Sequence, residues 1–210
     1  MENSEWGIGF YHLKAFKKME NSSFYSEEEL QELGLGGVGC DVKISKKTSF
    51  YTPQNIILGD HLRIDDFCVF SAGNGGITLG NYIHIACFCA LYAHEPIVMA
   101  DLSTLSSRVV IYTCSDDFSG SSLTNPTVPD EFRPDLIRGP VMINRHVVVG
   151  TNSTILPDVT IGTGCAIGAH SLVNQNLAEW GIYAGVPARR VKDRKQDLLV
   201  LEKRFLSSRR

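Results

Sequence analysis

The chain has 210 residues, of which 43% are hydrophobic and 20% charged, with a formal net charge of −3 and a pI of about 6.1. This length allows one well-buried core. The weak net charge gives no support to a nucleic-acid or anionic-membrane partner. The stretch from Met1 to Phe10 lacks the features of a signal peptide, and no apolar run is long enough to span a bilayer, so we expect a cytoplasmic protein.

The N-terminal segment, residues 1–37, is expected to form a helical cap. Residues 10–20 and 26–33 have helical character, and Ser26 is placed to cap the second helix. Glutamates in the first turn of that helix suit its dipole. A cap of this kind would cover the open end of the structure that follows.

Residues 38–175 carry a six-residue repeat of aliphatic side chains. Neither a helix, with a period of 3.6, nor an isolated strand, with a period of 2, would produce a strict interval of six. The repeat predicts an all-β solenoid, a left-handed parallel β-helix of about six triangular coils with three hexads in each. The repeated positions are Val38, Ile44, Phe50, Leu58, Ile64, Phe70, Leu79, Ile85, Leu91, Met99, Leu105, Ile111, Ile143, Val149, Ile155, Ile161, Ile167 and Val173.

A second apolar series lies two residues before the first, because side chains alternate along a strand. It includes Cys68, Cys89 and Cys165, which predicts that these thiols fill the core as small hydrophobes. Only Cys87 and Cys89 are closely spaced and no CxxC pair accompanies them, so neither a metal site nor a disulfide framework is expected.

Interruptions of the repeat all follow the third hexad of a coil, so they are expected to project from one edge of the prism. The longest interruption, residues 112–140, is rich in Pro, Asp and Ser. A loop of this length usually carries function. The C-terminal segment, residues 176–210, is expected to contain a helix from Val191 to Leu206 that caps the other end.

Two sequence runs make the chain resemble the hexapeptide-repeat acyltransferases, particularly the galactoside and maltose O-acetyltransferases. They are ILPDVTIGTGCAIGAHSLV at 155–173 and AGVPARRVK at 184–192, and the resemblance covers about residues 26–194. The segments YTCSDDFSG (112–120) and TNPTVPDEF (124–132) resemble a subgroup associated with surface-polysaccharide or nucleotide-sugar modification. The resemblance implies a homotrimer that moves acetyl from acetyl-CoA to a hydroxyl of a sugar or surface-polysaccharide precursor, without a metal.

The resemblance also implies a catalytic histidine, because an alcohol is a poor nucleophile until a general base takes its proton. At the family's usual position this chain has Asp116, followed by Asp117, and an aspartate is a weaker base unless burial raises its pKa. His84, on a flat face, and His94, one coil below the long loop, are the candidates to replace it. We expect one of these histidines to pair with Asp116; the alternative is an aspartate as base, or no side-chain base.

Each candidate also has a structural interpretation. His84 would be a subunit-contact residue, His94 a solvent-exposed corner residue, and Asp116 and Asp117 turn formers. The other histidines are expected at the surface or in the N-terminal segment, without a catalytic role: His12, His61, His146 and His170.

The coenzyme site that the resemblance implies lies in the crevice and the C-terminal segment. Arg189 and Lys192 would meet the phosphates, and Thr151 and Ala169 would lie along the pantetheine arm. Gln175 stands where the family commonly has a lysine. The alternative for the two cations is a solvated helix start.

Two other functions share this fold. A γ-type carbonic anhydrase would need a close pair of zinc-binding histidines, but the nearest pair, His84 and His94, is ten residues apart. The second is a scaffold without turnover, since fold alone does not establish function. Within acyl transfer, the missing histidine favours the alternative of N-acetylation of a nucleotide-linked amino sugar, because an unprotonated amine needs less help from a base.

Overall fold

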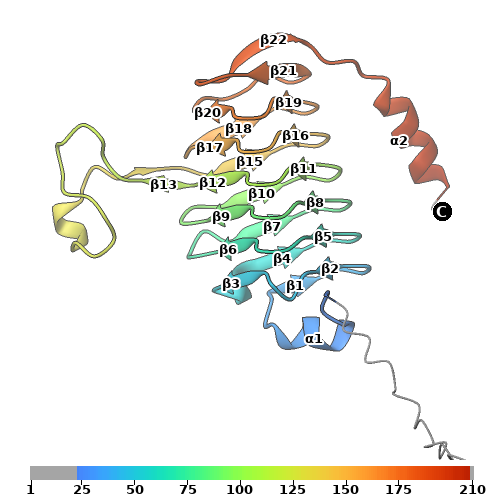
Figure 1. Cartoon of the computed structure of the whole chain (residues 1–210), viewed down its shortest axis with the longest axis horizontal. Helices are drawn as coiled ribbons and strands as arrows, with labels where there is room; N and C mark the ends of the chain where they lie inside the picture. Colours follow the sequence, from blue (N-terminus) through green and yellow to red (C-terminus); the bar gives the residue numbers. More distant parts are fainter. Residues whose placement is uncertain (1–22, 209–210) are drawn as a thin grey trace, which may run out of the picture.

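The computed structural model describes residues 23–208 as a left-handed parallel β-helix with a projecting arm and two helices (Figure 1). The helix expected over residues 10–20 lies outside the described residues. Six complete coils of three strands are followed by part of a seventh, which contains a bridge at Leu177 and strand β21 (Gly181–Ala184). The predicted solenoid is therefore confirmed, with about seven coils instead of six.

Strands at equivalent positions of successive coils pair in parallel and form three sheets. The first sheet contains β1 (Gly37–Val38), β4 (Ile56–Leu58), β7 (Ile77–Leu79), β10 (Ile97–Met99), β15 (Val141–Ile143) and β18 (Val159–Ile161). The second contains β2 (Lys43–Ile44), β5 (Arg63–Ile64), β8 (His84–Ile85), β11 (Thr104–Leu105), β16 (Val148–Val149), β19 (Ala166–Ile167), β21 and β22 (Arg189–Asp193). The third contains β3 (Ser49–Tyr51), β6 (Val69–Ser71), β9 (Ala90–Tyr92), β12 (Val110–Tyr112), β17 (Thr154–Ile155) and β20 (Leu172–Val173). We call the corners after these sheets the first, second and third edges.

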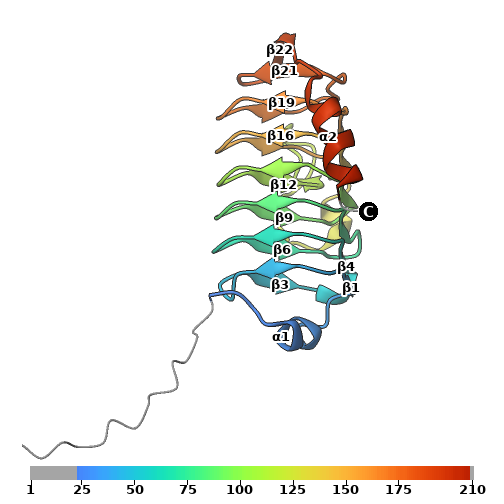
Figure 2. The same ribbon diagram turned by 90° about the vertical axis from the view of Figure 1, so that its right-hand side faces the viewer.

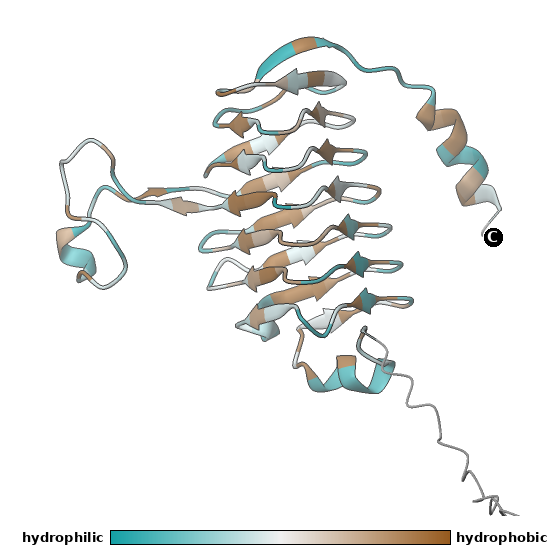
Figure 3. Ribbon diagram, viewed as in Figure 1, coloured by the Kyte–Doolittle hydropathy of each residue, from teal (hydrophilic) through white to brown (hydrophobic). Residues whose placement is uncertain are grey.

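The core of the solenoid follows the predicted repeat. All the repeated aliphatic positions are buried except Val38 and Phe50, which are partly exposed and pack against the core. Cys68, Cys89 and Cys165 are completely buried, which confirms their role as small core residues. Apolar side chains from all three sheets meet inside the prism, and brown segments therefore recur in coil after coil in Figure 3.

A short helix closes the N-terminal end of the solenoid. Helix α1 (Glu27–Glu32) begins at the predicted cap, where the Ser26 hydroxyl accepts a hydrogen bond from the main-chain N–H of Glu29 and the Glu29 carboxylate accepts one from the N–H of Ser26. This reciprocal pair satisfies two main-chain donors that the first turn leaves open. Leu30 is buried and belongs to the core, so the helix expected over 26–33 is confirmed.

The C-terminal segment differs from its prediction. Strand β21 pairs in parallel with β19, so the solenoid continues past the expected end at residue 175 to Ala184. Residues 189–193 then form β22, antiparallel to β21, and helix α2 begins only at Leu198 and ends at Ser207. A helix starting at Val191 was wrong because β21 provides an open strand edge on which this segment pairs.

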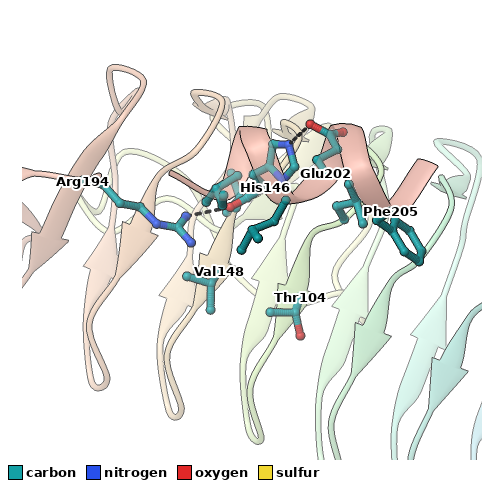
Figure 4. A pocket seen from close by; sticks show the side chains of 10 residues that line it. Thr104, His146, Val148, Arg194, Glu202 and Phe205 are labelled. Atoms are coloured by element: carbon teal, nitrogen blue, oxygen red, sulfur yellow. Dashed lines mark hydrogen bonds and ion pairs between the residues drawn. The ribbon is translucent and has the colours of Figure 1, made fainter. Parts of the chain in front are cut away.

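Helix α2 runs along the first edge of the solenoid (Figure 2). Glu202 accepts hydrogen bonds from Arg145. Its other carboxylate oxygen lies 3.0 Å from Nε2 of His146 (Figure 4). Nη1 of Arg194 donates to the main-chain oxygen of His146 at 2.7 Å. His146 is only 7% exposed, so its expected surface position was wrong: the helix covers it.

Replacing Glu202 by glutamine is expected to weaken this docking and to lower the free energy of unfolding at pH 7 by about 1–2 kcal/mol. Burial opposes ionisation of Glu202, but hydrogen bonds from Arg145 and His146 outweigh it and hold its pKa below the ordinary 4.5. A lowered pKa gives stability that is complete above about pH 4.5 and is lost as the pH falls through the folded-state value. The difference between the two proteins should therefore shrink in denaturant titrations as the pH is taken from 7 to 3.5.

Glu179→Gln is the matched control for this experiment, because Glu179 lies exposed on the same edge and forms no ion pair within residues 23–208. A constant difference at all pH values between wild type and Glu202→Gln would contradict the proposed role of the charge.

The long insertion forms an arm at the third edge, as expected. Strands β13 (Cys114–Ser115) and β14 (Ile137–Arg138) pair in an antiparallel ribbon that leaves the solenoid between its fourth and fifth coils (Figure 1). We call residues 113–140 the arm; its tip contains the short helix η2 (Asp130–Phe132). The smaller insertions also follow the third sheet, one of them as the helix η1 (Pro53–Asn55). Within residues 23–208 no helix has the length and apolarity needed to cross a membrane.

Candidate active site

A column of small residues runs along the second edge from the third coil to the seventh. The first two corner residues in these coils are Ala86 and Cys87, Ser106 and Ser107, Gly150 and Thr151, Gly168 and Ala169, and Ala184 and Gly185. We call this column the small-residue track. It covers four coil intervals of about 4.8 Å, or about 19 Å in all. In the second coil the same positions hold Asp65 and Asp66, so the track ends there.

The track offers main-chain donors to a ligand. The N–H groups of Ser107, Thr151 and Ala169 make no hydrogen bond to any residue within 23–208. Hydrogen bonds next to these N–H groups link adjacent coils. The Thr151 hydroxyl donates to the Ser107 carbonyl at 2.6 Å, and the His170 N–H donates to the Thr151 carbonyl at 2.8 Å. A narrow ligand with amide groups, such as pantetheine, would find a row of unpaired N–H donors here.

Close packing of the coils explains why the track residues are small. A Cβ atom added to Gly150 would lie 2.5 Å from the main-chain nitrogen of Ala169, which is too close for any side chain. The predicted residues Thr151 and Ala169 both belong to the track. Ala169 is exposed, and Thr151 is half-buried.

Strand β22 places the two predicted cations above the track. Arg189 lies opposite Ala184 of β21, and Lys192 lies opposite Ile182 on the outer side of the second sheet. The Arg189 guanidinium donates only to the neighbouring Ala188 carbonyl, and Lys192 forms no ion pair within the described residues. Both side chains are exposed and so are available to anions.

Arg190 has a different role from the two predicted cations. A register shift in the β21–β22 pair sets Arg190 against Tyr183, whose hydroxyl is 3.0 Å from its Nη1. Its Nη2 donates to Asp193 at 2.8 Å. Arg190 is therefore held by contacts within the chain.

His84 is hydrogen bonded to Asp65, and the pair expected with Asp116 is not formed within the chain. Nε2 of His84 lies 2.8 Å from Oδ2 of Asp65, and Nε of Arg63 donates to the other carboxylate oxygen at 2.7 Å. Burial of Asp65 opposes its ionisation, but these hydrogen bonds outweigh it and lower its pKa. An ionised carboxylate that orients an imidazole is the arrangement a general base needs, and His84 lies two residues before the start of the track at Ala86.

His94 and Asp116 line one cavity of 220 Å³ at the base of the arm, together with Arg133 and Arg138. The two side chains share this cavity without a direct hydrogen bond. Oδ1 of Asp116 accepts from the N–H of Asn125 at 3.2 Å and lies 4.0 Å from Nη1 of Arg133. Nδ1 of His94 lies 3.8 Å from a carboxylate oxygen of Glu95.

Asp117 anchors the first turn of the arm. Its carboxylate accepts hydrogen bonds from the main-chain N–H groups of Ser119, Ser121 and Ser122 at 2.8, 2.7 and 3.2 Å. The hydrogen bonds from Ser119 and from these N–H groups lower the pKa of Asp117 to about 2. Such a carboxylate is ionised at neutral pH and is a weak proton acceptor, which agrees with the turn-forming interpretation.

The arm exposes large apolar side chains to solvent. Phe118 is 89% exposed, and a cavity of 640 Å³ beside it is also lined by Tyr112, Ile137, Leu156 and Pro157. A projecting element rarely exposes apolar side chains as large as Phe118 and Ile137 to solvent.

The residues that line the track below Thr151 were not among those predicted from the sequence. Cys87 and Ser107 face each other in adjacent coils, with Sγ 3.4 Å from Oγ. Aligning the hexads that follow the second sheet would have shown them, because this corner position holds small residues from the third coil upward. Within residues 23–208 no group of three or more His, Cys, Asp or Glu side chains is arranged to hold a metal ion.

Residues 140–175 match the family described as bacterial transferase hexapeptide (six repeats). The chain is 42% identical over 186 residues to the dTDP-4-amino-4,6-dideoxy-D-glucose acyltransferase of Escherichia coli, covering 89% of this chain and 96% of that protein. It belongs to the hexapeptide-repeat acyltransferases. It is also 30% identical over 158 residues to the putative lipopolysaccharide biosynthesis O-acetyl transferase WbbJ of E. coli K12, with 71% and 74% of the two chains covered.

Solved structures agree with this family. The N-acyltransferase AntD from Bacillus cereus, crystallised as a variant with dTDP and coenzyme A, superimposes with a TM-score of 0.85 at 45% identity, covering 89% of this chain and 98% of that one. A maltose O-acetyltransferase from Clostridium difficile 630 shares the fold, with a TM-score of 0.52 at 22% identity over 81% and 75% of the chains. The present acyltransferase is therefore an enzyme that uses a coenzyme A thioester and acts on sugars, which sets aside the scaffold alternative.

Proposed function

We propose that this acyltransferase transfers an acyl group from its coenzyme A thioester to the amino group of a dTDP-linked 4-amino-4,6-dideoxy sugar. The observation that carries the proposal is the similarity, over nearly the full length, to two enzymes that are described as acting on this substrate or as binding dTDP with coenzyme A. Those similarities favour N-acylation, the alternative considered from the sequence, over transfer to a hydroxyl.

The geometry of the second edge supports the donor side of this proposal. The small-residue track would receive the pantetheine arm, with its amides facing the free N–H groups of Thr151 and Ala169. Arg189 and Lys192 above the track would face the phosphates of the coenzyme. In this proposal the thioester would lie near the lower end of the track, around Ser107 and Cys87.

In the proposed reaction the neutral amine attacks the thioester carbonyl and forms the C–N bond. The C–S bond then breaks, and the proton released by the nitrogen neutralises the departing thiolate. Because an uncharged amine is already a good nucleophile, this reaction depends less on a histidine than transfer to a hydroxyl does. The arm's Asp116, in place of the family's usual histidine, fits such an acceptor, and His84 with Asp65 is the proposed base where one is needed.

The proposed assembly is a homotrimer in which the arm of one protomer covers the small-residue track of its neighbour. Phe118, Leu123, Phe132 and Ile137 on the arm are each more than half exposed. Figure 1 shows the arm extending away from its own solenoid, so these side chains need another surface to cover them. We also place the enzyme in the cytoplasm, in surface-polysaccharide biosynthesis, supported by its similarity to the E. coli K12 protein.

The acceptor assignment predicts strong preference for an amine. With acetyl-CoA or 3-hydroxybutyryl-CoA as donor, the kcat/KM for dTDP-4-amino-4,6-dideoxyglucose should exceed that for the matching sugar with a hydroxyl at C4 by at least about a hundredfold. Thiol release measures the rate, and mass spectrometry of the product locates the acyl group. Faster transfer to the hydroxyl sugar, or to free maltose or galactosides, would show that the proposed acceptor is wrong.

A further inference from the structure

A largely buried arginine lies inside the arm, although the arm projects into solvent. The Arg133 side chain is only 12% exposed, and the residue follows directly after the short helix η2. Its Nε donates to the Val128 carbonyl at 2.9 Å, and its Nη2 forms an ion pair with Asp130. Both partners lie in the tip of the arm. A guanidinium withdrawn from water needs partners for its donors, and these two contacts occupy two of its three nitrogens.

The third nitrogen of this guanidinium faces the base of the arm. Nη1 of Arg133 lies 4.0 Å from Oδ1 of Asp116, and the N–H of Asn125 donates to the same oxygen at 3.2 Å. Oδ2 of Asp116 forms no hydrogen bond or ion pair within residues 23–208. Arg133 therefore connects the tip of the arm to one oxygen of this carboxylate and leaves the other oxygen available to a ligand.

Asp116 lies between two cavities at the base of the arm. The cavity of 220 Å³ has His94, Arg133 and Arg138 in its lining, and the cavity of 640 Å³ has Phe118. Asp116 lines both of them, and its side chain is 35% exposed. A ligand can therefore reach the carboxylate, while the guanidinium that holds it stays covered by the arm.

We propose that Arg133 is a positioning residue for acyl transfer. It fixes the carboxylate of Asp116 so that Oδ2 accepts a hydrogen bond from the attacking amine of the acceptor. The amine nitrogen gains positive charge as the C–N bond forms, and a carboxylate already held in place stabilises that charge without moving. The C–S bond then breaks, and the proton passes from the nitrogen to the departing thiolate. This inference rests on the proposed function, because it concerns the acceptor of that same reaction.

The test is a double-mutant cycle on the full-length enzyme, with dTDP-4-amino-4,6-dideoxyglucose and acetyl-CoA as substrates. Arg133→Gln should lower kcat at least about tenfold and leave the KM for acetyl-CoA within about twofold of wild type. When Arg133→Gln is added to Asp116→Asn, the further loss of kcat should be less than about twofold, because the arginine acts through that carboxylate. Arg133→Lys keeps the charge without the planar fork, so its kcat should lie between those of Arg133→Gln and wild type.

Two controls separate positioning from support of the arm. Asp130→Asn removes the ion pair on the other side of the guanidinium. Asp130 is 79% exposed, so this pair contributes little, and kcat should stay within about twofold of wild type. Arg204→Gln removes the same charge from helix α2, where Arg204 is exposed and forms no ion pair in the described part of the chain. Thermal unfolding and light scattering of all these variants should match wild type.

Three outcomes would overturn the role of Arg133. One is a wild-type kcat in Arg133→Gln, and another is an equal loss of kcat with and without the Asp116 carboxylate. The third is a loss of the native oligomer in Arg133→Gln, or as large a loss of activity in Asp130→Asn, since the arginine would then only maintain the shape of the arm. The proposed function fails separately: if wild type acylates a hydroxyl sugar and not the amino sugar, the acceptor is wrong, and the same cycle measured with that sugar decides the role of Arg133.

Discussion

Replacing Ala169 by tyrosine is expected to raise the KM for acyl-CoA at least about tenfold and to leave the free energy of unfolding within about 1 kcal/mol of wild type. Ala169 is exposed in the sixth coil, near the upper end of the small-residue track, with coils on both sides of it. A phenol ring at this point would fill the line along which the pantetheine arm is proposed to lie. It would also cover the free N–H of Thr151 in the coil below.

Ala178→Tyr is the matched control, because Ala178 is also exposed at a corner, but on the first edge. That variant should have the wild-type KM for acyl-CoA and the wild-type affinity for coenzyme A in isothermal titration. Thermal unfolding of both variants checks that the fold is kept. A wild-type KM for acyl-CoA in Ala169→Tyr would contradict binding of the coenzyme along the second edge. The proposed roles of Arg189 and Lys192 would then be wrong as well.

The fold could be predicted from the sequence because a solenoid repeats one local rule. Each hexad puts an aliphatic residue inward at the same point of its strand, so the interval from Ile143 to Val173 already fixes strands, sheets and core. The position of Ser26 predicted the first helix for a similar reason, since capping is settled within one turn. Local rules of this kind need no knowledge of distant contacts.

The features that sequence analysis missed depend on contacts between distant segments. The stretch from Arg189 to Asp193 has the charged composition of a surface helix. It forms a strand because β21 offers an unpaired edge. The sequence around His146 is that of a surface corner. His146 is buried because the helix that contains Glu202, 56 residues later, packs over it. His84 forms a hydrogen bond with Asp65, one coil below. Aligning the coils in the sequence could have predicted this partner.

The candidate site was predicted in part. Thr151, Ala169, Arg189 and Lys192 do lie along or above one edge, because their positions follow from the repeat and from the end of the solenoid. The arm obeys no repeat, so the surroundings of Asp116 and Asp117 could not be derived. In the proposed trimer the arm would cover the track of another protomer, and the pattern of a single chain carries no information about such a contact.

Replacing Asp117 by alanine is expected to reduce kcat/KM by at least about a hundredfold, with little change in coenzyme A binding. The carboxylate is the acceptor for three main-chain N–H groups in the first turn of the arm. An ionised carboxylate is a strong acceptor for main-chain N–H groups, so the turn should lose its shape without the aspartate. The proposed cover over the neighbouring track would then be misplaced, although the track itself is intact.

The proposed sharing of the site between neighbouring protomers gives this prediction a second measurable outcome. Asp117→Ala disturbs the arm and Ala169→Tyr obstructs the track, so each protein alone should have low activity when acyl-CoA is kept well below the raised KM. If the two are refolded together in equal amounts, a track that still binds coenzyme meets an intact arm at about a quarter of the sites in randomly mixed trimers. Activity should therefore return to about a quarter of the wild-type value per chain. A mixture as inactive as its two components would mean that each chain builds its site from its own arm and track, and the proposed contact between neighbours would be wrong.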